Sequence, residues 1–153
     1  MSHIRISKEK NYGPLIPPGR AHIIVGLEPL ETLRILPEYG NKDAQLIVNA
    51  RPIYPLNVIA GEVEYPELMK IKSIIESAGA ALYWLDATSM AVTLGGAIVL
   101  NMIMLGALCM LEDFPLGMDH MKEALATSLL KSKLEANFKA LDMGAAHVRR
   151  DVQ

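Results

Sequence analysis

The feature that most constrains this chain is an uncharged stretch between Asp86 and Glu112, which reads DATSMAVTLGGAIVLNMIMLGALCMLE. A membrane-spanning helix needs about 20 continuous apolar residues, and Gly95 and Gly96 interrupt this stretch before that length is reached. The run that remains, residues 97–111, rises by about 1.5 Å per residue and is too short for a hydrocarbon core about 30 Å thick. We therefore expect it to be buried in protein.

The glycine pair divides the stretch into two helices of different character. Asp86 is a favourable N-cap for the first helix, whose apolar residues at positions i, i+3, i+4 and i+7 predict an amphipathic surface. These residues are Ala87, Met90, Ala91 and Leu94. The second helix is apolar on every side, which predicts a helix covered all round. Asn101 is its one strongly polar side chain and would need hydrogen-bond partners if buried.

The composition favours a single globular domain. A chain of 153 residues that is 51% hydrophobic and 21% charged can build one sizeable core. The net charge of −2, with Lys and Arg scattered, argues against a nucleic-acid partner. The only cysteine, Cys109, cannot build a disulfide, an Fe–S cluster or a thiolate zinc site within this chain. With no signal-peptide pattern in MSHIRISKEK, we expect a cytoplasmic protein without a membrane segment.

Helices and strands are predicted to alternate along the chain. SHIRIS has the alternation of a half-exposed strand, and strands are expected at residues 21–26 and 45–49. A helix between these two strands begins at Pro29 and is limited by Pro37. A second helix, residues 66–77, is expected to end at Gly79 before another strand. Its inward residues are expected to be Leu68, Ile71, Ile74 and Ile75.

Two further helices follow Glu112, with a break expected between residues 130 and 133. Strands alternating with helices predict an α/β fold, a three-layer αβα domain with a mostly parallel sheet followed by C-terminal helices. Ligands of such folds bind outside the carboxyl ends of the strands. Those ends are expected at residues 26–28, 49–52 and 86–88.

Each polar residue at this predicted edge has two interpretations. Glu28 and Asp86 precede helices, so N-capping is the simpler explanation for them. Arg51 either holds a phosphate or carboxylate, or is an exposed loop residue. The four histidines do not have the spacing of metal ligands, and no nucleophile elbow, Walker A loop or dinucleotide-binding glycine motif occurs.

Several separated motifs resemble one known family. SHIRIS, YGPLIP, HIIVGLEPLETLR, LIVNARPIYP, LDATSMA and GGAIVLNMIMLGAL occur in this order. Together they resemble the gamma domain of 2-oxoacid:ferredoxin oxidoreductases, and especially the beta subunits of the indolepyruvate enzymes. The likeness extends over residues 2–144.

The resemblance implies an accessory subunit of an enzyme that decarboxylates an aryl 2-oxoacid, such as indolepyruvate, using coenzyme A and ferredoxin. The related enzymes include those acting on pyruvate. Thiamine diphosphate and Fe–S clusters are expected on a catalytic partner subunit, with no cofactor bound by this chain alone. The residues expected to shape the strand-end site and the subunit contact are Gly26, Glu28, Asn49, Arg51, Asp86 and Asn101.

The resemblance also sets the expected domain boundaries. Family members begin with a strand and a GxGGQG loop that opens a helix, a pattern this sequence does not contain. We expect one gamma-type domain over residues 1–146, truncated at its N-terminus relative to the family, and a frayed tail over residues 147–153. The alternatives are a non-catalytic interaction module that has lost ligand binding, a homo-oligomer that covers its own apolar surface, and an independent small-molecule binding domain.

Overall fold

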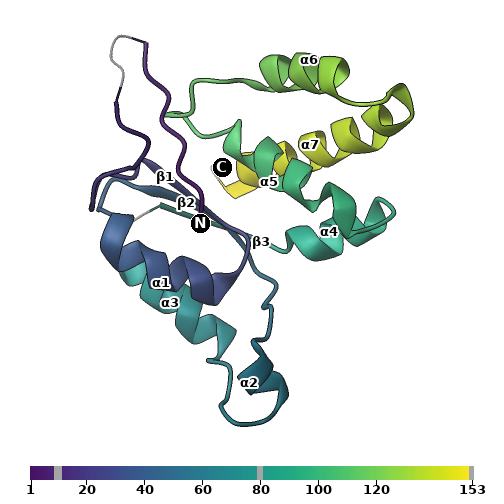
Figure 1. Cartoon of the computed structure of the whole chain (residues 1–153). Coiled ribbons are helices and arrows are strands. Elements are labelled where there is room, and N and C mark those ends of the chain that lie inside the picture. Colours follow the sequence, from purple (N-terminus) through teal and green to yellow (C-terminus); the bar gives the residue numbers. More distant parts are fainter. Residues whose placement is uncertain (9–11, 79–80, 152–153) are drawn as a thin grey trace.

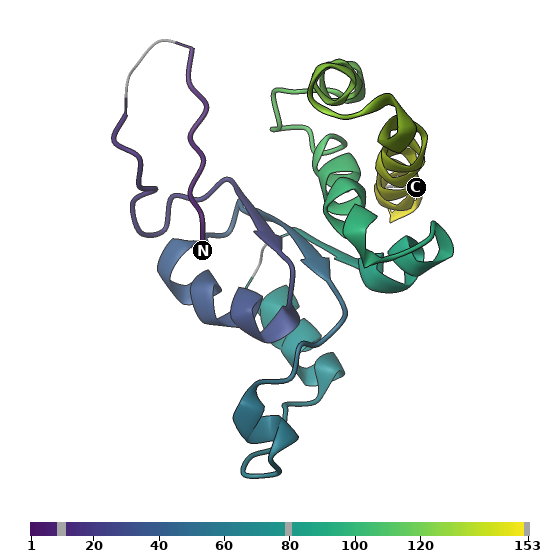
Figure 2. The same ribbon diagram turned by 45° about the vertical axis from the view of Figure 1, so that its right-hand side comes forward.

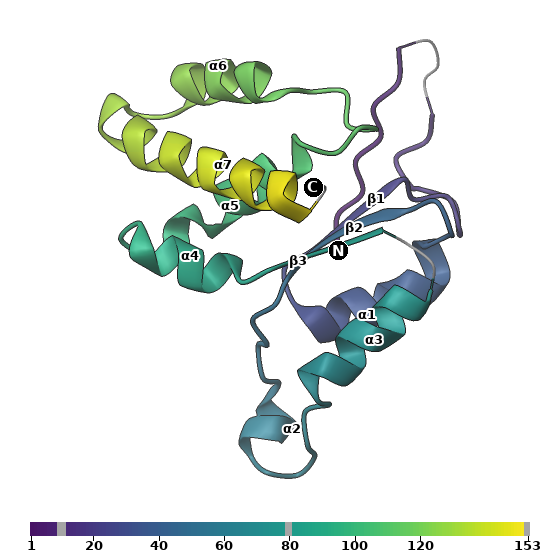
Figure 3. The same ribbon diagram turned by 180° about the vertical axis from the view of Figure 1, so that it is seen from behind.

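The computed structural model describes residues 1–8, 12–78 and 81–151, which form three layers (Figure 1). Within these residues, three strands form a parallel sheet in the order β1 (Ile23–Gly26), β2 (Gln45–Asn49) and β3 (Ala81–Leu85). Helices lie on both faces of the sheet, as the view from behind also shows (Figure 3). The predicted α/β fold, with a parallel sheet and C-terminal helices, is confirmed.

Helices α1 (Pro29–Tyr39) and α3 (Leu68–Ser77) cover one face of the sheet. The core between these helices and the sheet contains Ile24, Leu46 and Val48 of the strands and Leu36, Ile71 and Ile75 of the helices. Pro37 does not end α1, which continues to Tyr39 before the Gly40 N–H donates to the Leu36 carbonyl at 2.8 Å. A proline in the last turn is tolerated because little helix follows it.

The predicted inward face of α3 is partly wrong. Ile71 and Ile75 are buried against the sheet, but Ile74 is 44% exposed. Ile74 lies at a shallow hollow between α1 and α3, so neither helix covers it fully. Gly79, expected to end this helix, lies outside the described residues.

The uncharged stretch covers the opposite face of the sheet. It forms α4 (Ala87–Thr93), a short 3-10 turn η1 (Ala97–Val99) and α5 (Leu100–Leu108). Gly95 and Gly96 have φ angles of 103° and 143°, which separate the two helices as predicted. Asn101 is exposed on α5, so this helix is not covered all round and the amide needs no buried partner. Within the described residues, no helix combines the length and hydrophobicity of a membrane span.

Two further helices, α6 (Met118–Ser128) and α7 (Lys131–Asp151), complete this layer. The turn between them falls at residues 129–130, at the start of the predicted break. Figure 2 shows α7 beside α5 on the side of the sheet away from α1. The expected frayed tail is helical as far as Asp151, because Val148 is buried in the same core as Ile47 and Ile103.

The N-terminal segment is not the predicted strand. Residues 1–7 form no strand, and their alternation is inverted, with Ile4 and Ile6 exposed. His3 and Arg5 face the protein instead. The Ile16 N–H donates to His3 Nδ1 at 3.1 Å, while Arg5 donates to the carbonyls of Gly13 and Leu15 at 2.8 and 3.0 Å. Side-chain hydrogen bonds hold this segment in place of a strand ladder.

Two glycines bring α5 and α7 into backbone contact. A Cβ built on Gly106 would lie 2.0 Å from the Leu141 carbonyl oxygen, and one on Gly144 would lie 1.9 Å from the Ile103 carbonyl oxygen. Both neighbouring atoms belong to helix backbone and cannot rotate away. The two helices can therefore approach this closely only while both positions are glycine.

We expect Gly106→Ala and Gly144→Ala each to reduce the free energy of unfolding by about 1–3 kcal/mol, because the added methyl group overpacks the crossing. Urea unfolding followed by circular dichroism measures the change. Gly13→Ala is the matched control, since a Cβ there meets no atom within 4 Å. Equal stability of Gly106→Ala and Gly13→Ala would contradict the close crossing.

Candidate functional site

The carboxyl ends of the three strands meet at one edge of the sheet, as predicted. In the register of the strands, Gly26 is paired with Val48 and Asn49 with Leu85. The loops that follow carry Glu28, Arg51 and Asp86. Five of the six predicted site residues therefore lie at or directly after this edge. Asn101 does not belong to this group, since it is on α5, which packs on the face opposite to α1.

Asn49 links the ends of all three strands. Its buried side-chain amide donates to the Leu27 carbonyl after β1 and to Thr88 Oγ1 in α4, both at 3.1 Å. The amide oxygen accepts from the Thr88 N–H at 3.3 Å. The polar atoms of this buried side chain are thus used inside the protein, and Asn49 acts as a structural tie.

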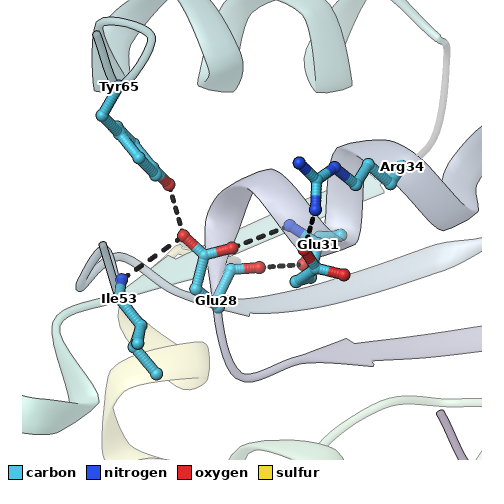
Figure 4. Close-up of polar contacts among 6 residues, drawn as sticks. Glu28, Glu31, Arg34, Ile53 and Tyr65 are labelled. Carbon is cyan, nitrogen blue, oxygen red and sulfur yellow. Dashed lines mark hydrogen bonds and ion pairs between the residues drawn. The ribbon is translucent and has the colours of Figure 1, made fainter. Parts of the chain in front are cut away.

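Glu28 has a similar internal role (Figure 4). It is 7% exposed, and its carboxylate caps α1 by accepting from the Glu31 N–H at 2.7 Å. The other carboxylate oxygen accepts from the Tyr65 hydroxyl and from the Ile53 N–H, the latter at 3.5 Å. Glu28 therefore joins the start of α1 to both ends of the long segment that connects β2 to α3.

The Tyr65 hydroxyl is held in its protonated form. Burial, the hydrogen bond to Glu28 and the negative charge of that carboxylate all raise the pKa of Tyr65 well above its ordinary value of 10.0. The Tyr54 ring packs edge-on against the Tyr65 ring with 5.2 Å between centroids. Tyr65 thus acts here as a hydrogen-bond donor rather than as a proton acceptor.

Asp86 caps α4 as predicted. It accepts from the Ser89 N–H at 3.0 Å, and this bond lowers the pKa of the carboxyl group, with the charge of Arg51 acting in the same direction. Arg51 is exposed at this edge. The capping interpretation is therefore confirmed for both Glu28 and Asp86.

Gly26 is required by packing. A Cβ at this position would lie 1.8 Å from Thr32 Oγ1, and this hydroxyl donates to the Glu28 carbonyl at 2.7 Å. The absence of a side chain lets the first turn of α1 pack directly against the end of β1. Gly26 thus contributes to the shape of the edge and supplies no contacting side chain.

This arrangement limits the chemistry of the edge. Helix N-termini attract anions, but the N-termini of α1 and α4 are already capped by carboxylates of the chain itself. Arg51 is left as the cation that could meet a phosphate or a carboxylate. Among the described residues, no group of three or more His, Cys, Asp or Glu side chains is arranged to hold a metal ion.

The hollow between α1 and α3 does not belong to this site. It has a volume of about 390 Å³ and is lined by the C-terminal turns of α1 and α3, including Leu36, Gly40 and Ile74. These turns lie at the amino-terminal edge of the parallel sheet, since the helices run antiparallel to the strands. The hollow and the polar strand ends are therefore separate features.

Sequence reasoning missed Tyr65, Ile53 and the role of Thr88. Tyr65 is 37 positions from Glu28 along the chain, so no local pattern connects the two residues. Thr88 had a weak signal, because it lies two residues after the capping Asp86, within the predicted strand end at residues 86–88. The short helix α2 (Leu56–Ile59), in the segment between β2 and α3, was also missed.

We expect Tyr65→Phe to lower the free energy of unfolding by about 1–2 kcal/mol near neutral pH, because Glu28 loses a hydrogen bond. The difference from wild type should shrink above pH 10. There the unfolded chain loses the Tyr65 proton while the folded chain retains it, so wild-type stability declines. Urea unfolding at pH 8 and pH 10.5 tests both effects, with Tyr12→Phe as the control. A difference that does not change with pH would contradict the raised pKa.

Comparison with known proteins identifies the family of this chain. Residues 1–147 match the family model described as pyruvate ferredoxin/flavodoxin oxidoreductase. The chain is 37% identical to indolepyruvate oxidoreductase subunit IorB of Pyrococcus horikoshii over 87% of this chain and 66% of that protein. It is 32% identical to subunit IorB of Thermococcus kodakarensis over 94% of this chain and 71% of that protein. It is 33% identical to subunit IorB of Archaeoglobus fulgidus over 93% of this chain and 69% of that protein. The chain thus spans about two thirds of the length of these relatives. It belongs to the pyruvate ferredoxin/flavodoxin oxidoreductase family.

Proposed function

We propose that this chain is an accessory subunit of an indolepyruvate-like 2-oxoacid:ferredoxin oxidoreductase. The observation that carries the proposal is its likeness, over most of the chain, to proteins named as indolepyruvate oxidoreductase subunits. Within the complete enzyme, an aryl 2-oxoacid is oxidatively decarboxylated, its acyl group passes to coenzyme A, and the electrons pass to ferredoxin. The proposed location is the cytoplasm.

The side chains of this subunit suit a supporting role. Fe–S clusters are held by several cysteine thiolates, and the sequence contains Cys109 alone. Glu28 and Asp86 are engaged as helix caps, and the Asn49 amide ties the strand ends together. This chain therefore does not fit an Fe–S cluster, and we assign the clusters and thiamine diphosphate to a catalytic partner subunit.

The proposed contribution of this chain is to shape the region next to that partner. Gly26, Glu28, Asn49 and Asp86 fix the backbone at the strand ends, and Arg51 presents an exposed guanidinium there. The 3′-phosphate or the diphosphate of coenzyme A is the kind of group that this guanidinium would meet. Asn101, exposed on α5, is proposed for subunit contact.

A non-catalytic interaction module is the second candidate. One observation favours it: the carboxylates at the N-termini of α1 and α4 oppose the binding of a phosphate at either helix end. Such a module would retain the packing surface of the family without contacting coenzyme A. An independent small-molecule binding domain is the third, and binding of coenzyme A to the purified chain alone would favour it.

Purification of this chain from its source organism under anaerobic conditions tests the accessory role. We expect recovery of a large thiamine-dependent Fe–S subunit, identified by mass spectrometry, and indolepyruvate oxidation that requires coenzyme A and an electron acceptor. Repeating the assay with pyruvate and with other aryl 2-oxoacids identifies the preferred substrate. A chain that emerges alone, or bound only to copies of itself, would contradict the proposal.

Substitution of Arg51 separates the first candidate from the second. We expect Arg51→Ala to raise the KM for coenzyme A of the assembled enzyme about tenfold, the effect of losing one charge-assisted contact of about 1.4 kcal/mol. Subunit assembly should be retained, because the side chain is exposed. Arg34→Ala is the control, since Arg34 pairs with Glu31 on the surface of α1. An unchanged KM for coenzyme A would favour the interaction module.

A further inference from the structure

The segment between β2 and α3 projects from the body of the protein at the strand-end edge (Figures 1 and 3). It contains α2, which has no buried residue. Leu56 and Ile59 are 85% and 69% exposed, and Ile53, Tyr54 and Val63 are also exposed. We call residues 53–63 the apolar tip. Single exposed apolar side chains are normal, but a cluster on one projecting segment indicates an interaction surface.

The apolar tip is held in a defined position. Glu28 accepts hydrogen bonds from the Ile53 N–H, before α2, and from the Tyr65 hydroxyl, after it. The turn itself is closed by backbone bonds from the Ala60 N–H to the Leu56 carbonyl at 2.8 Å and from the Glu62 N–H to the Asn57 carbonyl at 2.9 Å. A surface ordered before binding loses less conformational entropy when a partner covers it.

The charge and shape of the apolar tip indicate its partner. Residues 52–67 include Glu62, Glu64 and Glu67, all exposed, and neither Lys nor Arg. Two copies of this segment packed about a twofold axis would bring acidic groups together, because such an interface repeats the same surface. A projecting apolar segment that is followed along the chain by exposed acidic residues instead complements a concave apolar groove with a basic rim on a different protein.

We propose that the apolar tip is the element by which this chain docks into such a groove on the catalytic partner subunit. This inference rests on the proposed function, which supplies the partner. Arg51 lies two residues before the tip, so docking at this position brings the strand-end edge against the partner. The Glu28 and Tyr65 contact then acts as the anchor that sets the direction of the tip.

A pair of serine substitutions tests the docking role. The Leu56→Ser, Ile59→Ser double variant removes apolar contact from the tip without touching the core, since both residues are exposed. The matched control is Leu15→Ser with Leu130→Ser, because these residues are 68% and 74% exposed elsewhere on the chain. Affinity for the purified large subunit of the same enzyme is measured by biolayer interferometry, and circular dichroism checks that each variant is folded.

We expect the tip variant to bind the large subunit at least thirtyfold more weakly than wild type, and the control to bind within threefold of wild type. Equal binding by the tip variant and wild type would overturn the docking role while leaving the proposed function intact. Failure of wild type and control alike to bind the large subunit would contradict the proposed function itself.

Charge reversal tests whether the groove on the partner has a basic rim. Glu62→Lys with Glu64→Lys should weaken binding at least tenfold and reduce its dependence on salt, because acidic groups would no longer face a basic rim. Light scattering of the wild-type chain alone examines self-association. A dimer that dissociates in the Leu56→Ser, Ile59→Ser variant would show that a second copy is the occupant, and would overturn the assignment to a different protein.

Discussion

The close crossing of α5 and α7 is the constraint on which one whole layer of the fold depends. Gly106 and Gly144 each face the carbonyl oxygen of the other helix, so the two backbones touch without intervening side chains. This contact lets α7 pack beside α5 and bury Ala140 and Val148 in the core that includes Ile47. The uncharged stretch is therefore paired with a much more polar helix that lies beside α5.

The sequence predicted the alternation of helices with parallel strands because that feature depends on local patterns. Helices α1 and α4 begin at the predicted positions, after the caps Glu28 and Asp86 and with Pro29 in the first turn of α1. The Gly95–Gly96 pair separates α4 from the helical residues that follow. The N-terminal segment was mispredicted because alternation alone does not supply a strand partner. There, hydrogen bonds from and to Arg5 and His3 turned the polar residues inward. The predicted burial of Ile74 was wrong for a related reason, since periodicity does not show how far apart two helices lie.

The candidate site was predicted in position but not in detail. The carboxyl ends of parallel strands must share an edge, so Gly26, Asn49 and Asp86 could be placed together from sequence alone. The contacts that decide their roles are long-range. Tyr65 reaches Glu28 across 37 residues, and Thr88 reaches Asn49 across 39. Asn101 was grouped with the edge from the resemblance, but it lies on a helix that covers the other face.

The internal hydrogen bonds of the carboxylates at the strand-end edge explain both its limited chemistry and its rigidity. Carboxylates that cap helices and accept internal hydrogen bonds are poor general bases, because their charge is already stabilised where it is. The same contacts make the edge rigid. Glu28 stabilises the start of α1 and, through Tyr65 and Ile53, fixes the segment that carries the apolar tip. The acidic residue that first suggested a ligand site thus belongs to the framework that presents a surface, and this division suits a subunit whose partner performs the chemistry.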